Sequence, residues 1–134
     1  MYMKNQNPVD APEAALALAM RMADEVGHIA RRYFRTRPEV TSKEDESPVT
    51  IADREIEMVL RDRIRAAFPD HGIRGEEYAN HQPSADWCWH LDPIDGTKSF
   101  LSGSLCFGTQ IALTHLGRPV LGLIDQPMLL DLLE

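Results

Sequence analysis

Apolar residues recur every three or four positions in two long stretches near the start of the chain, which is the spacing of an amphipathic helix. The first stretch covers about residues 11–35, and its apolar positions are Ala15, Leu18, Met22, Val26, Ile29 and Tyr33. Asp10 with Glu13 three positions later has the spacing of a capping box, and Pro38 closes the stretch. The pattern predicts a helix that packs one face against a sheet.

A second helix is predicted from Thr50 to Ala67. Thr50 and Asp53 have the spacing of a capping box, and Phe68-Pro69 ends the pattern. The apolar stripe of this helix contains Ala52, Ile56, Val59, Leu60, Ile64 and Ala67. An acid in the first turn of a helix stabilises the helix dipole without any further function, so Asp53 alone does not indicate a site.

The remaining sequence changes to alternating and short apolar runs, which are typical of β-strands. The predicted strands are Ile73, Trp87–Leu91, Cys106–Leu113 and Val120–Ile124. The segment from His115 to Pro119 predicts a hairpin between the last two strands. Two helices followed by several strands indicate an α+β fold, with the helices packed on a largely antiparallel sheet.

The composition excludes several classes of protein. Among 134 residues, 14 Lys and Arg face 21 Asp and Glu, which gives a net charge of −7. This acidic balance argues against binding of nucleic acid or an anionic membrane surface by bulk charge, and it indicates a small partner. The chain shows no membrane-length apolar run and no secretory pattern, and Cys88 and Cys106 are interpreted as reduced thiols. We therefore expect a single cytoplasmic globular domain.

The candidate chemistry is concentrated in Asp92-Pro93-Ile94-Asp95-Gly96-Thr97, where a predicted strand runs into a turn. Two carboxylates on a proline-stiffened turn suit Mg²⁺, a hard cation that prefers oxygen ligands. If a short helix opens at Thr97, the free amides of Gly96 and Thr97 form an anion site. The same residues also suit an ordinary Asp-Pro turn with purely local hydrogen bonds. Gly75-Glu76-Glu77, after the strand at Ile73, either faces a site or forms a solvated turn.

Several separated motifs together resemble the inositol monophosphatase family of Mg²⁺-dependent phosphatases. The matching segments are Lys43 to Asp53, similar to the family's N-terminal loop and helix start; Gly75-Glu76-Glu77, similar to its upstream metal-binding glutamate; and Asp92 to Thr97 with Phe100, similar to its central signature. Within the family, Asp95–Gly103 and Gly122–Pro127 are most similar to the histidinol-phosphate phosphatase branch. The resemblance extends from the first helix to Asp125.

The resemblance implies that the chain hydrolyses a small phosphate monoester with Mg²⁺ as cofactor. Histidinol phosphate is the preferred substrate, and inositol monophosphate or a nucleotide 3'-phosphate are the alternatives. The implied metal ligands are Glu76, Asp92, the carbonyl of Ile94 and Asp95. The implied catalytic residues are Glu76 and Thr97, which position and deprotonate the attacking water. Asp53 is implied to orient Thr97 or a water, and Lys43 to lie near the outer metal. The amides of Gly96 and Thr97 are implied to bind the phosphate.

The sequence departs from the family in one respect that bears on function. It has no later tryptophan-aspartate motif, which supplies the family's remaining metal-ligating aspartate. We therefore expect residues 1–134 to form the N-terminal metal- and phosphate-binding domain of a layered αβαβα fold, without the C-terminal domain. A sheet that lacks its covering layer invites association, so we expect a homo-oligomer or a fragment of a longer chain. A non-catalytic remnant and an acidic α+β binding module remain the alternative functions.

Overall fold

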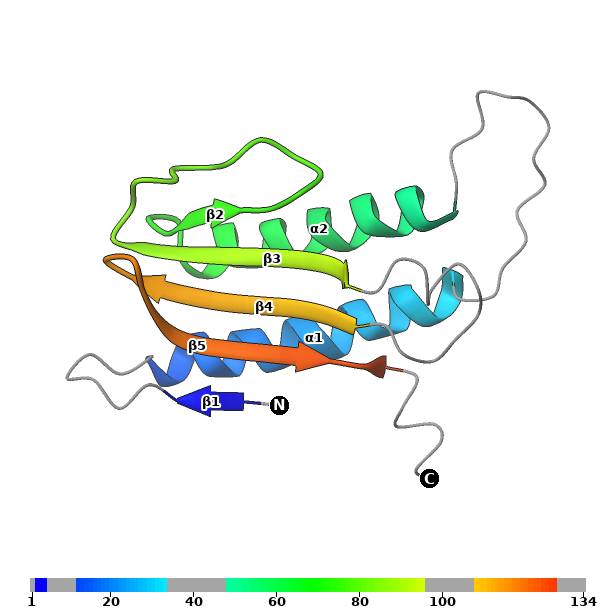
Figure 1. The fold of residues 1–134 in the computed structure, drawn as a ribbon, viewed down its shortest axis with the longest axis horizontal. Helices are drawn as coiled ribbons and strands as arrows, with labels where there is room; N and C mark the ends of the chain where they lie inside the picture. Colours follow the sequence, from blue (N-terminus) through cyan, green and yellow to red (C-terminus); the bar gives the residue numbers. More distant parts are fainter. Residues whose placement is uncertain (1, 5–11, 34–47, 96–107, 128–134) are drawn as a thin grey trace.

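The protein is a five-stranded sheet with two helices on one of its faces (Figure 1). The computed structural model describes residues 2–4, 12–33, 48–95 and 108–127. In chain order the elements are β1 (Tyr2–Lys4), α1 (Glu13–Tyr33), α2 (Pro48–Ala67), β2 (Gly72–Arg74), β3 (Trp87–Asp95), β4 (Gly108–His115) and β5 (Arg118–Asp125). The strand order across the sheet is β1-β5-β4-β3-β2. Only β2 and β3 pair in parallel among these strands, so the predicted α+β fold with a largely antiparallel sheet is confirmed.

The predicted apolar stripe of α1 faces the core. Its members from Ala15 to Ile29 are buried, whereas Tyr33 is half-buried and donates its hydroxyl to Glu55 at 2.6 Å. Asp10, the expected N-cap, lies outside the described residues. The periodicity of the sequence thus located both the helix and its buried face.

The start of α2 differs from the prediction. The helix begins at Pro48, so Thr50 lies inside it and cannot be the N-cap, and the predicted capping box is wrong. Proline is well tolerated at the first position of a helix, because the N–H it lacks would have no partner there. The helix ends at Ala67, directly before Phe68-Pro69 as predicted, although Ala67 itself is exposed.

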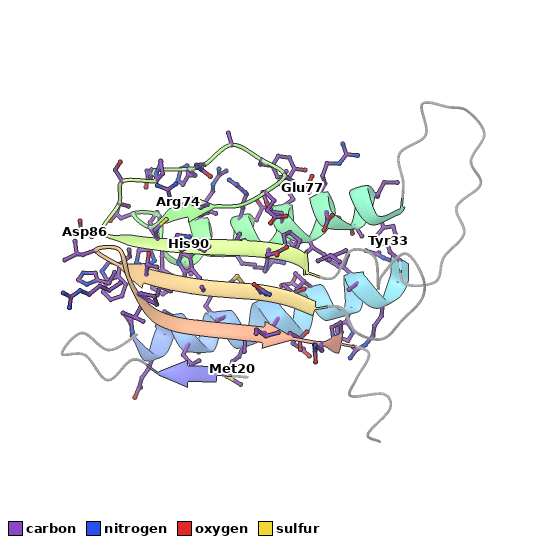
Figure 2. All side chains as sticks on the ribbon, viewed as in Figure 1. Met20, Tyr33, Arg74, Glu77, Asp86 and His90 are labelled. Carbon is purple, nitrogen blue, oxygen red and sulfur yellow. The ribbon has the colours of Figure 1, made fainter. Side chains whose placement is uncertain are left out.

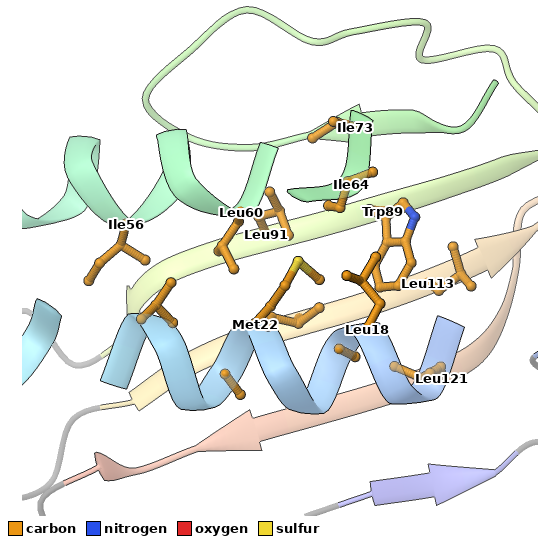
Figure 3. Packing of buried hydrophobic residues seen from close by; sticks show 14 of the residues in the cluster. Leu18, Met22, Ile56, Leu60, Ile64, Ile73, Trp89, Leu91, Leu113 and Leu121 are labelled. Carbon is orange, nitrogen blue, oxygen red and sulfur yellow. The ribbon is translucent and has the colours of Figure 1, made fainter. Parts of the chain in front are cut away.

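The hydrophobic core lies between the two helices and the sheet (Figure 3). Met22 of α1, Leu60 of α2 and Trp89 of β3 are fully or almost fully buried in it. The indole Nε1–H of Trp89 donates to Nδ1 of His71 at 3.0 Å, so the polar atom of this large side chain keeps a partner. This packing fixes α2 against β3, the two elements from which the candidate site is built.

The β4–β5 hairpin confirms the turn predicted between His115 and Pro119. Leu116 and Gly117 have φ values of 51° and 81°, and the flanking residues His115 and Arg118 pair with each other. Positive φ at both central positions is the geometry of a two-residue type I′ turn, whose twist matches that of the strands. The expected start of the β4 strand at Cys106 and the expected helix from Thr97 lie outside the described residues.

The short strand β1, which the sequence pattern did not predict, pairs with β5 through Tyr2 and Leu123. Cys88 is buried with a free thiol, in agreement with the expected structural role, and Cys106 lies outside the described residues. No helix in the described part of the chain is long and apolar enough to cross a membrane.

Candidate active site

The parallel pairing of β2 with β3 brings two predicted site residues to the same place. The register sets Arg74 beside His90, as Figure 2 shows on the neighbouring strands. Two residues beyond this pair, Glu76 on the loop after β2 and Asp92 in β3 line one open hollow of about 280 Å³. The structure therefore brings together Glu76 and Asp92.

A bulge follows Asp92 in β3. Asp92 pairs with Gln110, but Asp95 pairs with Gly108, so the β3 strand has one residue more than its partner in this interval. The carbonyl of Pro93 accepts a hydrogen bond from the Thr109 hydroxyl at 2.8 Å. The bulge therefore lies between the two predicted metal-ligating aspartates.

The Ile94 side chain is 4% exposed and belongs to the core, so only its backbone carbonyl is suited to the role predicted for it. The backbone of Asp95 lies at the end of β3, but its side chain is outside the described part of the structure. Gly96, Thr97 and Lys43 also lie outside the described residues, so their predicted roles stay predictions.

Asp53 on α2 is electrostatically coupled to these carboxylates. Burial, followed by the negative charges of Glu77, Asp92, Glu76 and Glu57, raises the pKa of Asp53 to about 7. Because α2 begins at Pro48, its first turn contains no acid, and a helix-dipole role no longer accounts for Asp53. The predicted residues Asp53, Glu76 and Asp92 thus form one acidic cluster between α2, the loop after β2, and β3.

The oxygen donors of this cluster fit Mg²⁺ in kind. Carboxylates are the ligands that a hard cation prefers, and a positive charge among them would relieve the repulsion that adds to the effect of burial on the pKa of Asp53. Among the described side chains, however, no group of three or more His, Cys, Asp or Glu is arranged to hold a metal ion. The described donors alone do not complete a metal site.

Two residues that sequence reasoning missed hold the loop of Glu76 in place. Glu57 of α2 is fully buried, and its carboxylate accepts hydrogen bonds from the backbone N–H groups of Glu76, Glu77 and Tyr78 at 2.7, 3.1 and 3.1 Å. Arg61, one turn later, donates from Nε to Glu57 at 2.9 Å. The available signal was their spacing, because Asp53, Glu57 and Arg61 follow one another every four residues and therefore share one helix face.

Comparison with models of known protein families shows to which family the chain is related. The model described as the inositol monophosphatase family matches residues 11–134. The chain belongs to the inositol monophosphatase family. The resemblance inferred from the separated sequence motifs is thereby confirmed.

Similarity to individual proteins agrees with this family assignment. The chain is 45% identical over 131 residues to the chloroplastic bifunctional phosphatase IMPL2 of Arabidopsis thaliana, with 93% of this chain and 38% of that protein covered. It is 42% identical to a histidinol-phosphatase of Chlorobaculum parvum, with 89% and 46% covered. The solved inositol monophosphatase from Zymomonas mobilis aligns with a TM-score of 0.78 and 45% identity, with 90% and 46% covered. The chain thus spans less than half the length of these relatives.

Proposed function

We propose that this inositol monophosphatase family member takes part in the Mg²⁺-dependent hydrolysis of a small phosphate monoester. The observation that carries the proposal is the acidic cluster of Asp53, Glu76 and Asp92, in which burial, together with the negative charges of Glu77, Asp92, Glu76 and Glu57, raises the pKa of Asp53 to about 7. Like charges gathered at one edge of a sheet are costly unless a cation binds among them. Phosphate esters are anionic, so a cation at this edge also provides a means of binding them.

In this proposal, the residues that would hold Mg²⁺ are Glu76, Asp92, Ile94 through its carbonyl, and Asp95. Bound Mg²⁺ would neutralise phosphoryl oxygens and lower the pKa of water, which makes water a nucleophile at neutral pH. Residues 1–134 would form the metal- and phosphate-binding part of the fold. The described hollow beside Glu76 and Asp92, about 280 Å³ in volume, is open enough to admit a small molecule.

The remaining residues of the proposed site act on protons and on the phosphate. Glu76 and Thr97 would position the attacking water, and the Glu76 carboxylate would accept its proton, either directly or through the Thr97 hydroxyl, which gives up one proton as it takes another. With a cation held in the cluster the pKa of Asp53 would be lower, and this carboxylate would accept a hydrogen bond from Thr97 or from water and orient it. The Gly96 and Thr97 amides would bind the phosphate, and Lys43 would lie near the outer metal and help to close the site.

Histidinol phosphate is the substrate we propose first. The similarity to a relative named histidinol-phosphatase, at 42% identity, supports this choice. Inositol monophosphate is the second candidate, because a solved relative named as an inositol monophosphatase is 45% identical to this chain. Both compounds are small phosphate monoesters, so a cation held by the acidic cluster would bind the same phosphate group in each of them.

The test is phosphate release from histidinol phosphate and from inositol monophosphate, with Mg²⁺ and with a chelator. We expect release only with Mg²⁺, and we expect Asp92→Asn to lower kcat at least about 100-fold because it removes a ligand charge. The matched control is Asp86→Asn, an exposed aspartate directly before the opposite end of β3 (Figure 2), which should leave the rate unchanged. A folded Asp92→Asn chain with the native rate contradicts the proposed metal ligand, and a native chain without Mg²⁺-dependent release contradicts the proposed function.

A further inference from the structure

We propose that Glu57 and Arg61 are positioning residues that set the place of the Glu76 carboxylate. The inference rests on the proposed function, because it takes Glu76 as a ligand of Mg²⁺. Neither residue belongs to the ligand set proposed above. Both act through the backbone of the loop that carries Glu76.

The Glu57 carboxylate is fully occupied by partners within the protein. One oxygen accepts the N–H groups of Glu76 and Glu77 at 2.7 and 3.1 Å, and the other accepts those of Tyr78 and Arg61 at 3.1 and 2.9 Å. A carboxylate offers about four lone-pair positions, so this one has no oxygen left for a cation. Its side chain is also 0% exposed. Glu57 therefore organises the loop and is not itself a metal ligand.

Arg61 fixes the next part of the same loop. While its Nε donates to Glu57, Nη1 donates to the Ala79 carbonyl at 2.8 Å and Nη2 to the Tyr78 carbonyl at 3.0 Å. Its side chain is 4% exposed, so both members of this ion pair are removed from water. A buried pair of this kind adds little net stability, because desolvation offsets the attraction between the charges. The main effect of the pair is on geometry, because the rigid guanidinium group of Arg61 holds the loop at a fixed distance from α2.

The loop passes so close to the Glu57 carboxylate that only glycine fits at position 75. A Cβ atom added to Gly75 would lie 2.5 Å from the carboxyl carbon of Glu57. The first residue after this contact is Glu76, and its amide makes the shortest hydrogen bond to Glu57. Asp53 precedes Glu57 by one helical turn on the same face, so α2 determines how far Asp53 lies from the Glu76 backbone.

The experiment compares Mg²⁺ affinity and amide hydrogen exchange in the native chain and in Glu57→Gln. A glutamine presents an N–H₂ group to backbone and guanidinium donors, so it loses part of the network while it keeps the size of the side chain. We expect Mg²⁺ to bind at least about tenfold more weakly by calorimetry. We also expect faster exchange of the Glu76, Glu77 and Tyr78 amides, read by NMR without metal.

The matched control is Glu55→Gln, the same substitution two residues earlier on α2. Glu55 makes a part-exposed ion pair with Arg32 at 2.5 Å, away from the loop of Glu76. We expect this variant to keep native Mg²⁺ affinity and native exchange of the loop amides. If Glu57→Gln does not fold, Arg61→Lys replaces it, because lysine keeps the charge beside Glu57 but lacks the three separate nitrogens with which Arg61 bonds to Glu57 and to both loop carbonyls. We expect Arg61→Lys to weaken Mg²⁺ binding at least about threefold.

The possible outcomes separate this inference from the proposed function. A merely structural role of Glu57 predicts a lower free energy of unfolding with unchanged Mg²⁺ affinity below the unfolding temperature, and that result overturns the inference while the proposed function stands. Weaker Mg²⁺ binding and faster exchange of the loop amides in Glu57→Gln, together with native values in Glu55→Gln, support the inference. A native chain that binds no Mg²⁺ overturns the proposed function and this inference together.

Discussion

Gly75 allows the loop backbone to lie directly against a buried carboxylate, and this contact leads to a prediction. In Gly75→Ala the new Cβ atom would lie 2.5 Å from the carboxyl carbon of Glu57, so either this hydrogen-bonded carboxylate or the loop must shift. We expect the free energy of unfolding to fall by about 1–3 kcal/mol, measured with urea. The control is Gly122→Ala in β5, where an added Cβ atom meets nothing within 4 Å. Equal stability of the two variants would contradict the close approach at Gly75.

The raised pKa of Asp53 predicts how the stability of the metal-free chain depends on pH. The pKa is about 7 in the folded chain against an ordinary 3.8, so between these values the folded chain binds the proton more tightly than the unfolded chain. Stability is therefore greatest below the lower pKa, falls as the pH rises toward the higher one, and is level above it. Because Asp53 is part-exposed, we expect this loss to be about 1–2 kcal/mol after solvent screening.

Asp53→Asn provides the measurement for this prediction. Unfolding by urea in chelator at about pH 5 and about pH 8 should show a smaller difference in the variant than in the native chain, because asparagine does not titrate. The two chains differ only at Asp53, so the difference between their pH dependences reports on this residue. The prediction is wrong if the two chains lose equal stability over this interval.

At the scale of elements, the β4–β5 hairpin contains a residue poorly suited to its turn. Leu116 has a φ of 51° and is 67% exposed, so its side chain meets the steric cost of the left-handed region with little burial in return. Leu116→Asn creates the Asn-Gly pair that type I′ turns prefer, and we expect it to raise the free energy of unfolding by about 1 kcal/mol. Leu116→Ala, which removes the apolar side chain without favouring positive φ, should stay within about 0.5 kcal/mol of the native chain in the same urea experiment.

Periodicity predicted the long elements because their buried faces repeat within the local sequence. The stripe from Ala15 to Ile29 in α1 is buried as predicted. The start of α2 was not predicted, because Thr50 and Asp53 have the spacing of a capping box, whereas the helix begins at Pro48, a residue that the first turn of a helix accepts. The strand β1 has only three residues, too few to show an alternating pattern, and it exists through pairing with β5.

The sequence predicted those residues of the candidate site that belong to a recognisable motif. Glu76 and Asp92 were identified from the sequence, but their approach depends on the parallel register of β2 and β3, which no local pattern encodes. Glu57 was missed because a glutamate beside an apolar stripe looks like a solvated residue. Its partners are backbone amides far along the chain, and only the fold reveals them.

For the whole molecule, the acidic cluster and the net charge of −7 predict that Mg²⁺ stabilises the fold. At a free Mg²⁺ concentration of about ten times Kd, the free energy of unfolding should rise by about 1.4 kcal/mol. Asp92→Asn should lose this gain. Salt alone also reduces repulsion in an acidic chain, so each measurement requires NaCl of equal ionic strength as its control. Equal effects of Mg²⁺ and NaCl would show that no specific site forms.

The parallel pairing of β2 and β3 also has a consequence for the order of events in folding. Glu76 and Asp92 belong to separate segments that meet only when these strands are side by side, and Asp53 comes from a third segment. In the unfolded chain these carboxylates are therefore scattered and do not form a chelating group for a cation. If the pairing forms after the rate-limiting barrier, Mg²⁺ should slow unfolding and leave the refolding rate unchanged in stopped-flow experiments. Faster refolding with Mg²⁺ than with NaCl would instead place this pairing within the folding nucleus.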